Sequence, residues 1–351
     1  MYKIITTSLV LLFTTIFYAQ EKPTAENTGY TGTLTNYTGS TTIQTDNTVI
    51  ENKLISGTIR IYANNVTIRN CKITTGGFYG IDIKEGENIL IEDCEIEGMQ
   101  SAAILGRNFT ARRCNIWNSG ADGIKPYSNF LIESCYFHHL GYVEDAHADG
   151  IQLVREGGGI ITGNNFDMGP ASGYKNSQCI IIQSNDAAVD DIVIDGNWIN
   201  GGGYSVQIRE RNYGPPTNIS ITNNLFGRDA QFGTHIIDGD NSVTNNVFNC
   251  NRYEDTNELV EGTTCDETLS TNNIELSNNI ISYPNPITNE LYVLENQGAN
   301  YELYSNTGKL IMKNTITSNN FNVKTNNLTS GIYVLKIFTK EGVTTKKIIK
   351  N

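Results

Sequence analysis

The sequence predicts an all-β solenoid, in which similar coils stack on one another, followed by a small separate β-domain. Two observations support this: a phrase of strand-forming residues recurs through most of the 351 residues, and residues 281–351 follow a different pattern. Each copy of the phrase has a small residue in the same slot: Cys71, Cys94, Cys114, Cys135, Asn164, Asn197, Asn224 and Asn246. The slots lie 23, 20, 21, 29, 33, 27 and 22 residues apart, a period typical of solenoid repeats.

Each repeat contains two strand-like segments. Alternating β-branched residues such as Val66 and Ile68 lead to the slot, and a second segment follows about ten residues later, for example at Ile81. Alternation with a period of two points one set of side chains inward and the other outward. We therefore expect the slot residues to form an internal ladder with rungs roughly 4.8 Å apart, in which Asn amides bond to one another and Cys is a small apolar filler.

This arrangement resembles the right-handed parallel β-helix of the pectate-lyase-like superfamily, and the resemblance covers roughly residues 45–250. It implies a right-handed parallel β-helix as the main domain. The fold is found in lyases, hydrolases, epimerases and binding proteins, so function has to be argued from the residues on its surface.

The N-terminal end has the pattern of a secretory signal. Lys3 is followed by an apolar run, Ile4–Tyr18, that is too short for a stable membrane span and precedes a small residue, Ala19. We therefore predict a cleaved signal peptide over residues 1–19, a β-helix domain over 20–265 and a linker over 266–280.

The C-terminal end has alternating strands and an Asn-Thr-Gly turn at residues 306–308, which predict a small antiparallel β-domain. Its phrases, YPNP at 283–286 and LTSGIYVL at 328–335 among them, resemble the C-terminal sorting domain of the type IX secretion system used by Bacteroidota. The resemblance covers residues 281–351 and implies a small β-sandwich that contacts the type IX machinery. It also implies export through the periplasm and outer membrane, with the protein secreted or attached to the cell surface.

Composition limits the partners. A net charge of −12 argues against nucleic acid, and any anionic substrate must meet a local basic patch. A hydrophobic content of 38% is enough for one elongated core, and we expect a monomer. Cys250 and Cys265 bracket a polar loop after the last coil, where an oxidising compartment favours a disulfide; the alternative is two free thiols.

The second strand of each coil predicts two outward-facing rows. Aligning six inward residues gives Asp82, Leu105, Lys125, Gln152, Ile181 and Gln207 as one row. Two positions further along, the second row is Lys84, Arg107, Tyr127, Val154, Gln183 and Arg209. The long steps after Cys135, Asn164 and Asn197 add residues to the middle coils, where we expect loops to wall a groove.

Two phrases in these middle coils repeat each other: residues 120–125 read GADGIK and residues 147–152 read HADGIQ. They place Asp122 beside Asp149 and Lys125 beside Gln152, with His147 at the mouth of an insertion. Lys, His, Arg, Gln and Tyr side chains together suit an acidic sugar, and they can perform β-elimination from a uronate.

The leading hypothesis is a secreted polysaccharide lyase acting on an anionic uronate polymer such as alginate, ulvan or pectate. Lys125, as a neutral amine, is the first candidate base, and His147 is the rival base or the acid. Substrate carboxylates would be held by Arg107, Gln152 and Arg209, with Tyr127 as a second possible acid.

Two other classes stay open. Asp122 and Asp149 precede Gly, which suits a turn, but they could also bind calcium, the one cofactor we expect, or serve as acid and base of a glycoside hydrolase. The third class is a non-catalytic glycan-binding β-helix.

Overall fold

The computed structural model confirms the all-β prediction. It describes residues 21–239, 241–265, 281–283, 287, 289–294, 298–305, 309–318, 320–339 and 342–350. The predicted signal peptide (1–19) and linker (266–280) lie outside these residues. Within the described part of the chain, no helix is long and apolar enough to cross a membrane.

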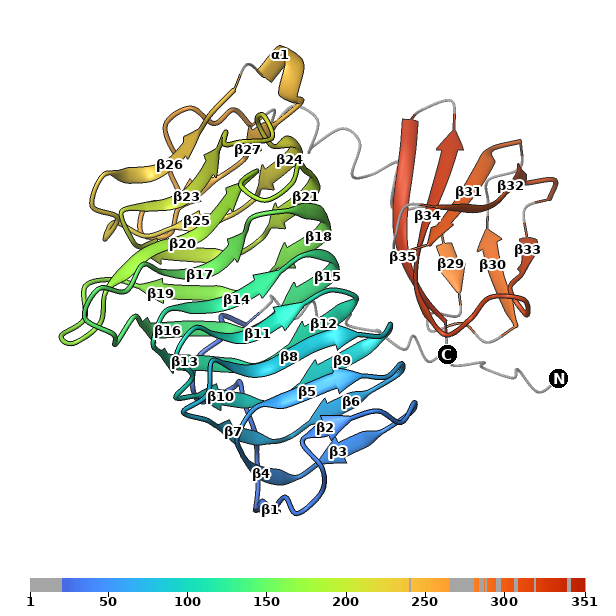
Figure 1. The fold of residues 1–351 in the computed structure, drawn as a ribbon. Coiled ribbons are helices and arrows are strands. Elements are labelled where there is room, and N and C mark those ends of the chain that lie inside the picture. The colour runs from blue at the N-terminus through green and yellow to red at the C-terminus, as the bar shows by residue number, and fades with distance from the viewer. Residues whose placement is uncertain are drawn as a thin grey trace, which may run out of the picture.

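Three parallel sheets form the main domain, and the chain visits them in turn on each coil (Figure 1). Sheet A consists of β1 (Thr35–Asn36), β4 (Lys53–Ser56), β7 (Lys72–Thr74), β10 (Glu95–Glu97), β13 (Asn115–Ser119), β16 (Tyr136–Leu140), β19 (Asn165–Met168), β22 (Trp198–Gly201), β25 (Leu225–Phe226) and β28 (Arg252–Tyr253). Sheet B consists of β2 (Thr42–Ile43), β5 (Ile59–Tyr62), β8 (Tyr79–Glu85), β11 (Ala102–Gly106), β14 (Asp122–Pro126), β17 (Ala148–Leu153), β20 (Asn176–Gln183), β23 (Tyr204–Arg209) and β26 (Gly233–Ile237). Sheet C consists of β3 (Val49–Glu51), β6 (Thr67–Arg69), β9 (Ile89–Glu92), β12 (Phe109–Arg112), β15 (Ser128–Glu133), β18 (Glu156–Thr162), β21 (Val189–Asp195), β24 (Thr217–Thr222) and β27 (Val247–Asn249).

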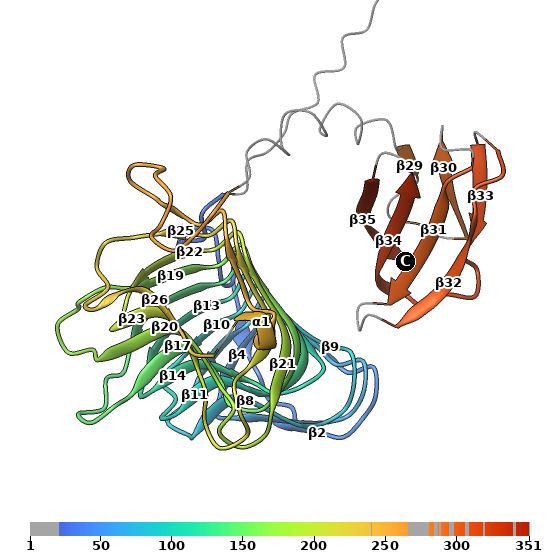
Figure 2. The same ribbon diagram turned by 90° about the horizontal axis from the view of Figure 1, so that it is seen from above.

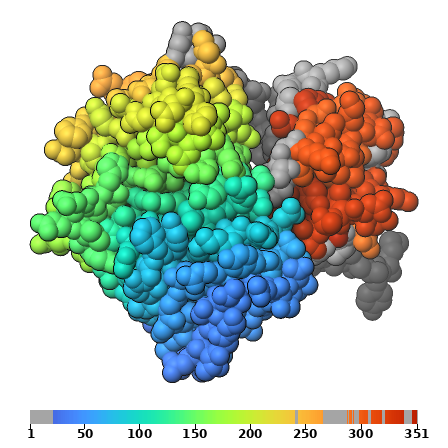
Figure 3. Space-filling model, viewed as in Figure 1, coloured from blue at the N-terminus to red at the C-terminus, as the bar shows by residue number. Residues whose placement is uncertain are grey.

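Each coil therefore has three strands, one more than the two the repeat predicted. The additional strand is the short one in sheet A that directly follows the slot, such as β7 after Cys71. Seen along the stack, successive coils superimpose (Figure 2). In the space-filling view they form successive bands, so each part of the outer surface comes from a few neighbouring coils (Figure 3).

The predicted ladder runs through the core, at the corner between sheets C and A. The four Cys and the residues Asn164, Asn197 and Asn224 are all fully buried. The Nδ2 atom of Asn164 donates to Asn197 Oδ1 and that of Asn197 to Asn224 Oδ1, each over 2.9 Å. Each rung thus satisfies the buried polar group of the next.

The last predicted rung was wrong: Asn251 occupies it, and Asn246 does not. Asn224 Nδ2 donates to Asn251 Oδ1 over 2.9 Å, whereas Asn246 Oδ1 accepts the N–H of Ile219. The phrase before Asn246 forms a short helix, α1 (Asn241–Thr244), so the sheet C strand of this coil is delayed to β27. The true step from Asn224 is 27 residues, equal to the step before it.

Asn residues also shape an outer corner of the coils. Asn65, Asn88, Asn108 and Asn129 have φ values of 54°, 58°, 59° and 51°, a left-handed conformation that Asn tolerates better than most residues. Their side chains bond from coil to coil, as Asn88 Nδ2 does to Asn65 Oδ1 over 2.9 Å. A corner with this backbone can therefore be repeated without glycine.

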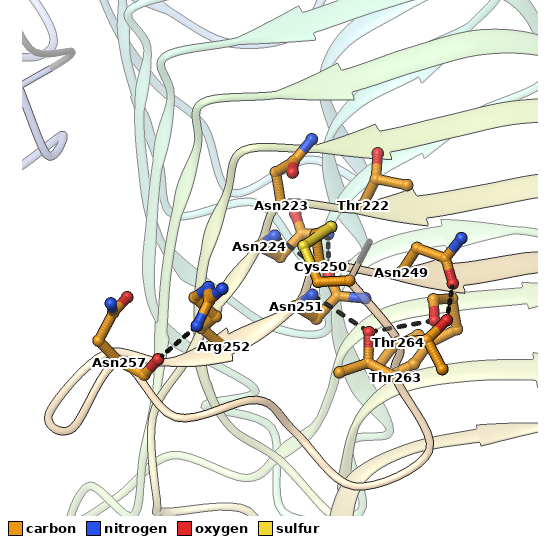
Figure 4. Close-up of a disulfide and its surroundings, with 12 residues drawn as sticks. Thr222, Asn223, Asn224, Asn249, Cys250, Asn251, Arg252, Asn257, Thr263 and Thr264 are labelled. Atoms are coloured by element: carbon orange, nitrogen blue, oxygen red, sulfur yellow. Dashed lines mark hydrogen bonds between the residues drawn. A yellow bond between two sulfur atoms is a disulfide. The ribbon is translucent and has the colours of Figure 1, made fainter. Parts of the chain in front are cut away.

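The predicted disulfide between Cys250 and Cys265 is present, with Cα atoms 4.5 Å apart (Figure 4). It joins the residue before the last rung of the ladder, Asn251, to the end of the loop that follows β28. Two hydrogen bonds hold the same loop: Cys250 N–H donates to Thr264 O over 2.9 Å, and Asn251 N–H donates to the side-chain Oγ1 of Thr263 over 3.3 Å. The loop therefore covers the C-terminal end of the β-helix core.

The C-terminal domain has two antiparallel sheets around its own core, as predicted. One sheet contains β29 (Ile281–Tyr283), β30 (Glu290–Leu294) and β33 (Asn320–Lys324). The other contains β31 (Asn300–Ser305), β32 (Leu310–Thr315), β34 (Gly331–Thr339) and β35 (Gly342–Lys350). Leu291, Leu303 and Leu335 are among the buried residues between them.

The ladder generates a stability prediction. Asn197→Ala removes the two hydrogen bonds that Asn197 Oδ1 accepts from Asn164 and the three that its Nδ2 donates, and it leaves buried groups of Asn164 unpaired. We therefore expect the free energy of unfolding to fall by roughly 2–4 kcal/mol. Urea unfolding followed by tryptophan fluorescence measures this in the β-helix, because both tryptophans, Trp117 and Trp198, lie in sheet A. Asn185→Ala, on an exposed loop, is the control; equal midpoints for the two variants would contradict a structural ladder.

Candidate functional site

The candidate site lies on the outer face of sheet B, where β14 and β17 begin. Ile124 pairs with Ile151, which puts Lys125 beside Gln152 as predicted. The N–H of Asp149 donates to Asp122 Oδ1 over 2.8 Å, so the two carboxylates also lie on adjacent strands. The two repeated phrases thus meet at one place.

The glycine in each phrase has a packing reason. A Cβ on Gly123 would lie 2.8 Å from the ring of Phe137, and one on Gly150 would lie 2.7 Å from the ring of Phe166. These rings stack in the core with centroids 4.7 Å apart. Glycine lets the strand bend tightly over them, which leaves the preceding Asp and the following Lys or Gln on the outer face.

Each aspartate links one coil to the next and also holds an outer side chain. Asp122 Oδ2 lies 2.7 Å from Lys125 Nζ, and Lys125 Nζ also lies 3.3 Å from Ser101 Oγ. Asp149 Oδ1 accepts the N–H of Gln178 over 3.0 Å. Its Oδ2 lies 3.2 Å from His147 Nδ1 and accepts Gln152 Nε2 over 3.1 Å.

Burial separates the carboxylates from the groups they hold. Asp122 and Asp149 are 1% and 0% exposed, whereas the side chains of Lys125 and His147 are 24% and 63% exposed. Burial and the charge of Asp149 raise the pKa of Asp122 to about 6, although Lys125 opposes the shift. The hydrogen bond to Asp149 raises the pKa of His147 above its ordinary value of 6.5. The groups that a solute meets first are therefore the lysine amine and the imidazole.

The predicted basic substrate ligands are engaged with acidic partners. Arg107 Nη2 lies 2.9 Å from Glu156 Oε1, and Arg209 Nε lies 3.0 Å from Asp238 Oδ2, a charge contact without hydrogen-bond geometry. The ring of Tyr127 lies near Arg107, 5.6 Å from its guanidinium. Burial raises the pKa of Tyr127. Arg107 and Arg209 are therefore paired with carboxylates, as Lys125 is with Asp122.

Three contributors were missed by reasoning from the sequence. The guanidinium of Arg155 also lies near Tyr127, 5.0 Å from the centroid of its ring, and it pairs with Asp186. Ser101 contacts Lys125, and Gln178 contacts Asp149. The position three residues before Lys125 in each coil would have pointed to Gln178, but the first predicted row began three residues later in each coil.

The long coils place their extra residues at both edges of sheet B. Residues 141–147 and 169–175 precede its strands β17 and β20, and residues 184–188 and 210–216 follow β20 and β23. The insertions thus flank the middle of the sheet, as the slot spacing predicted.

Calcium fits this arrangement poorly. The Oδ1 atoms of Asp122 and Asp149 accept main-chain N–H groups, and their Oδ2 atoms face the donors Lys125, His147 and Gln152. Among the residues the structure describes, no group of three His, Cys, Asp or Glu side chains is placed to hold a metal. Calcium binding stays a prediction.

Comparison with known families agrees with the two-domain architecture. Residues 31–178 match the family described as right handed beta helix region, and residues 282–351 match the secretion system C-terminal sorting domain. No curated protein and no solved structure gives a significant match to the sequence. The sorting domain indicates recognition by the type IX secretion machinery and export across the outer membrane to the cell surface or beyond. The chain therefore combines a right-handed β-helix region with a type IX secretion sorting domain at its C-terminal end.

Proposed function

We propose that the β-helix is a polysaccharide lyase that cleaves an anionic uronate-containing polymer, such as alginate, ulvan or pectate, by β-elimination. The observation that carries the proposal is the pair of presented groups, Lys125 and His147, each held at the outer surface by its own buried aspartate. Export to the cell surface or beyond supports a polymer substrate, which could not enter the cell intact.

The reaction sets three tasks for the site. A base takes the proton from C5 of the uronate, the C4–O4 bond breaks as a C4=C5 double bond forms, and an acid gives a proton to the departing O4. The carboxylate at C6 must be neutralised, because otherwise the C5 proton is too weakly acidic.

His147 is the base in our proposal. Asp149 holds Nδ1 of the ring over 3.2 Å, which leaves Nε2 for the C5 proton and stabilises the imidazolium that forms. The exposed ring can reach a bound chain without displacing buried groups.

Lys125 is assigned to the substrate carboxylate, which revises its expected role as the base. A neutral amine would leave the buried Asp122 carboxylate without its cationic partner, a costly arrangement. Gln152 lies beside it on the next strand and has a second amide hydrogen for the same carboxylate. Tyr127, whose raised pKa keeps the phenol protonated at neutral pH, is the candidate acid.

A glycoside hydrolase is the second candidate, because the pKa of Asp122 at about 6 suits a general acid. Both aspartates, however, are committed to main-chain bonds and are nearly inaccessible. The unsaturated uronate made by a lyase absorbs ultraviolet light, whereas hydrolysis gives new reducing ends without that absorbance.

Replacing the base should abolish most activity. For His147→Ala we expect kcat/KM to fall by roughly 10²–10⁴-fold, the usual contribution of a general base. The initial rate of unsaturated product formation on alginate, pectate and ulvan measures this. Undiminished rates on the polymer that the unaltered chain cleaves would remove His147 from the mechanism.

The activity should rise with pH through the pKa of His147, which lies above 6.5, because only the neutral imidazole accepts a proton. Asp149→Asn keeps an oxygen for the N–H of Gln178 but removes the charge that stabilises the imidazolium. The rising limb of kcat/KM against pH should therefore move to lower pH in this variant. A limb that stays in place or moves upward would contradict the Asp149–His147 pairing in catalysis.

Lys125→Met should lower kcat/KM by roughly hundredfold, because the substrate carboxylate loses its cationic partner. Lys125→Arg keeps the charge and should recover part of the rate. Lys84→Met is a matched control, since Lys84 Nζ also pairs with a buried aspartate, Asp82, over 2.8 Å on the same sheet. Equal losses in the Lys125→Met and Lys84→Met variants would indicate a general effect on folding.

A further inference from the structure

Two pairs of aromatic rings lie on the same face of sheet B as the candidate site. Phe78 and Tyr79, where β8 begins, meet edge to face with centroids 5.3 Å apart. Tyr204 and Phe232, where β23 and β26 begin, lie 5.8 Å apart. The outer rings are unusually open: Phe78 is 60% and Phe232 is 65% exposed.

Strand register puts the aspartates of the site between these pairs. Tyr79 pairs with Ala102, which pairs with Asp122, and Asp149 pairs with Gln178. Since Ile180 pairs with Val206, Gln178 is level with Tyr204. Since Ile124 pairs with Ile151, one register column runs Tyr79, Ala102, Asp122, Asp149, Gln178, Tyr204, and it spans about 24 Å at the usual strand separation. Its middle members are buried, and Lys125 and His147 are the partly exposed groups beside them.

Aromatic rings lie at both ends of this column and polar groups lie between them, an order that suits one kind of ligand. Exposed apolar rings that cluster in a patch are a common mark of a binding surface. A pyranose ring offers an apolar C–H face to an aromatic ring while its hydroxyls stay in water. Between the two pairs, Lys125 and His147 offer a cation and a proton acceptor for an acidic sugar.

We propose that the two aromatic pairs are sugar-binding platforms on either side of the catalytic groups. A polysaccharide would lie along the β-helix axis, across the strands, with an internal segment at Lys125 and His147. This inference rests on the proposed function for its substrate class, and it adds the direction of the chain and the binding of internal segments, the mode of an endo-acting enzyme.

Binding of oligosaccharides of increasing length tests the platforms. The probes are oligogalacturonates and alginate oligosaccharides, titrated by calorimetry into the full chain with His147→Ala to prevent turnover. Affinity should rise with length until a chain reaches both platforms. Phe78→Ala and Phe232→Ala should each weaken binding of the longest probe by roughly tenfold, which corresponds to about 1.4 kcal/mol. Ile160→Ala, which truncates a 41% exposed side chain on sheet C, should have no such effect.

Three outcomes would overturn the platforms: no binding of either probe series, affinity independent of length, or full affinity in both Phe variants. The test is separate from that of the lyase. Absence of unsaturated product from the unaltered chain would remove the elimination mechanism, whereas length-dependent binding lost in the Phe variants would still establish the two platforms.

Discussion

Register between parallel coils is the constraint on which this structure depends. Each coil bonds to the next through three short strands, so a side chain is placed by its position in the coil rather than by its neighbours in sequence. The buried ladder from Cys71 to Asn251 maintains that register, because the Asn amides of the ladder bond to one another from coil to coil. The same constraint brings residues 27 apart, Asp122 and Asp149, into contact.

The aspartate pair shows how structural and chemical roles are combined in one residue. One oxygen of each carboxylate accepts an N–H from the next coil, which satisfies a backbone donor of β17 or β20. The other oxygen holds Lys125 or His147 at the surface. Burial strengthens both contacts. Burial itself and the nearby charge of Asp149 also raise the pKa of Asp122 to about 6.

Charge on this protein is organised locally. The whole chain carries a net charge of −12. Near sheet B, most of the basic side chains form ion pairs with carboxylates. Lys125 is paired as well, with Asp122, but its partner is buried and the amine stays partly exposed. In the proposed function an anionic polymer is therefore recognised by a few oriented groups and by aromatic rings that carry no charge. Such recognition suits a long substrate, because each contact is weak and many can be made along the column.

Local patterns were enough to predict the repeat, the inward rows of sheet B, the disulfide and the sorting domain, since period-two alternation and short motifs depend on adjacent residues. They also placed Lys125 beside Gln152, because the two phrases have the same length. They failed at Asn246, because a short helix takes the place of the expected strand and shifts the rung to Asn251. They also gave no sign that Arg107 pairs with Glu156, which is 49 residues away. Pairing of that kind depends on how each loop brings its coil back onto the stack, and loop length and path are decided by tertiary packing. For the same reason, only the folded chain shows that Asp122 is the partner of Lys125 and that Asp149 holds His147.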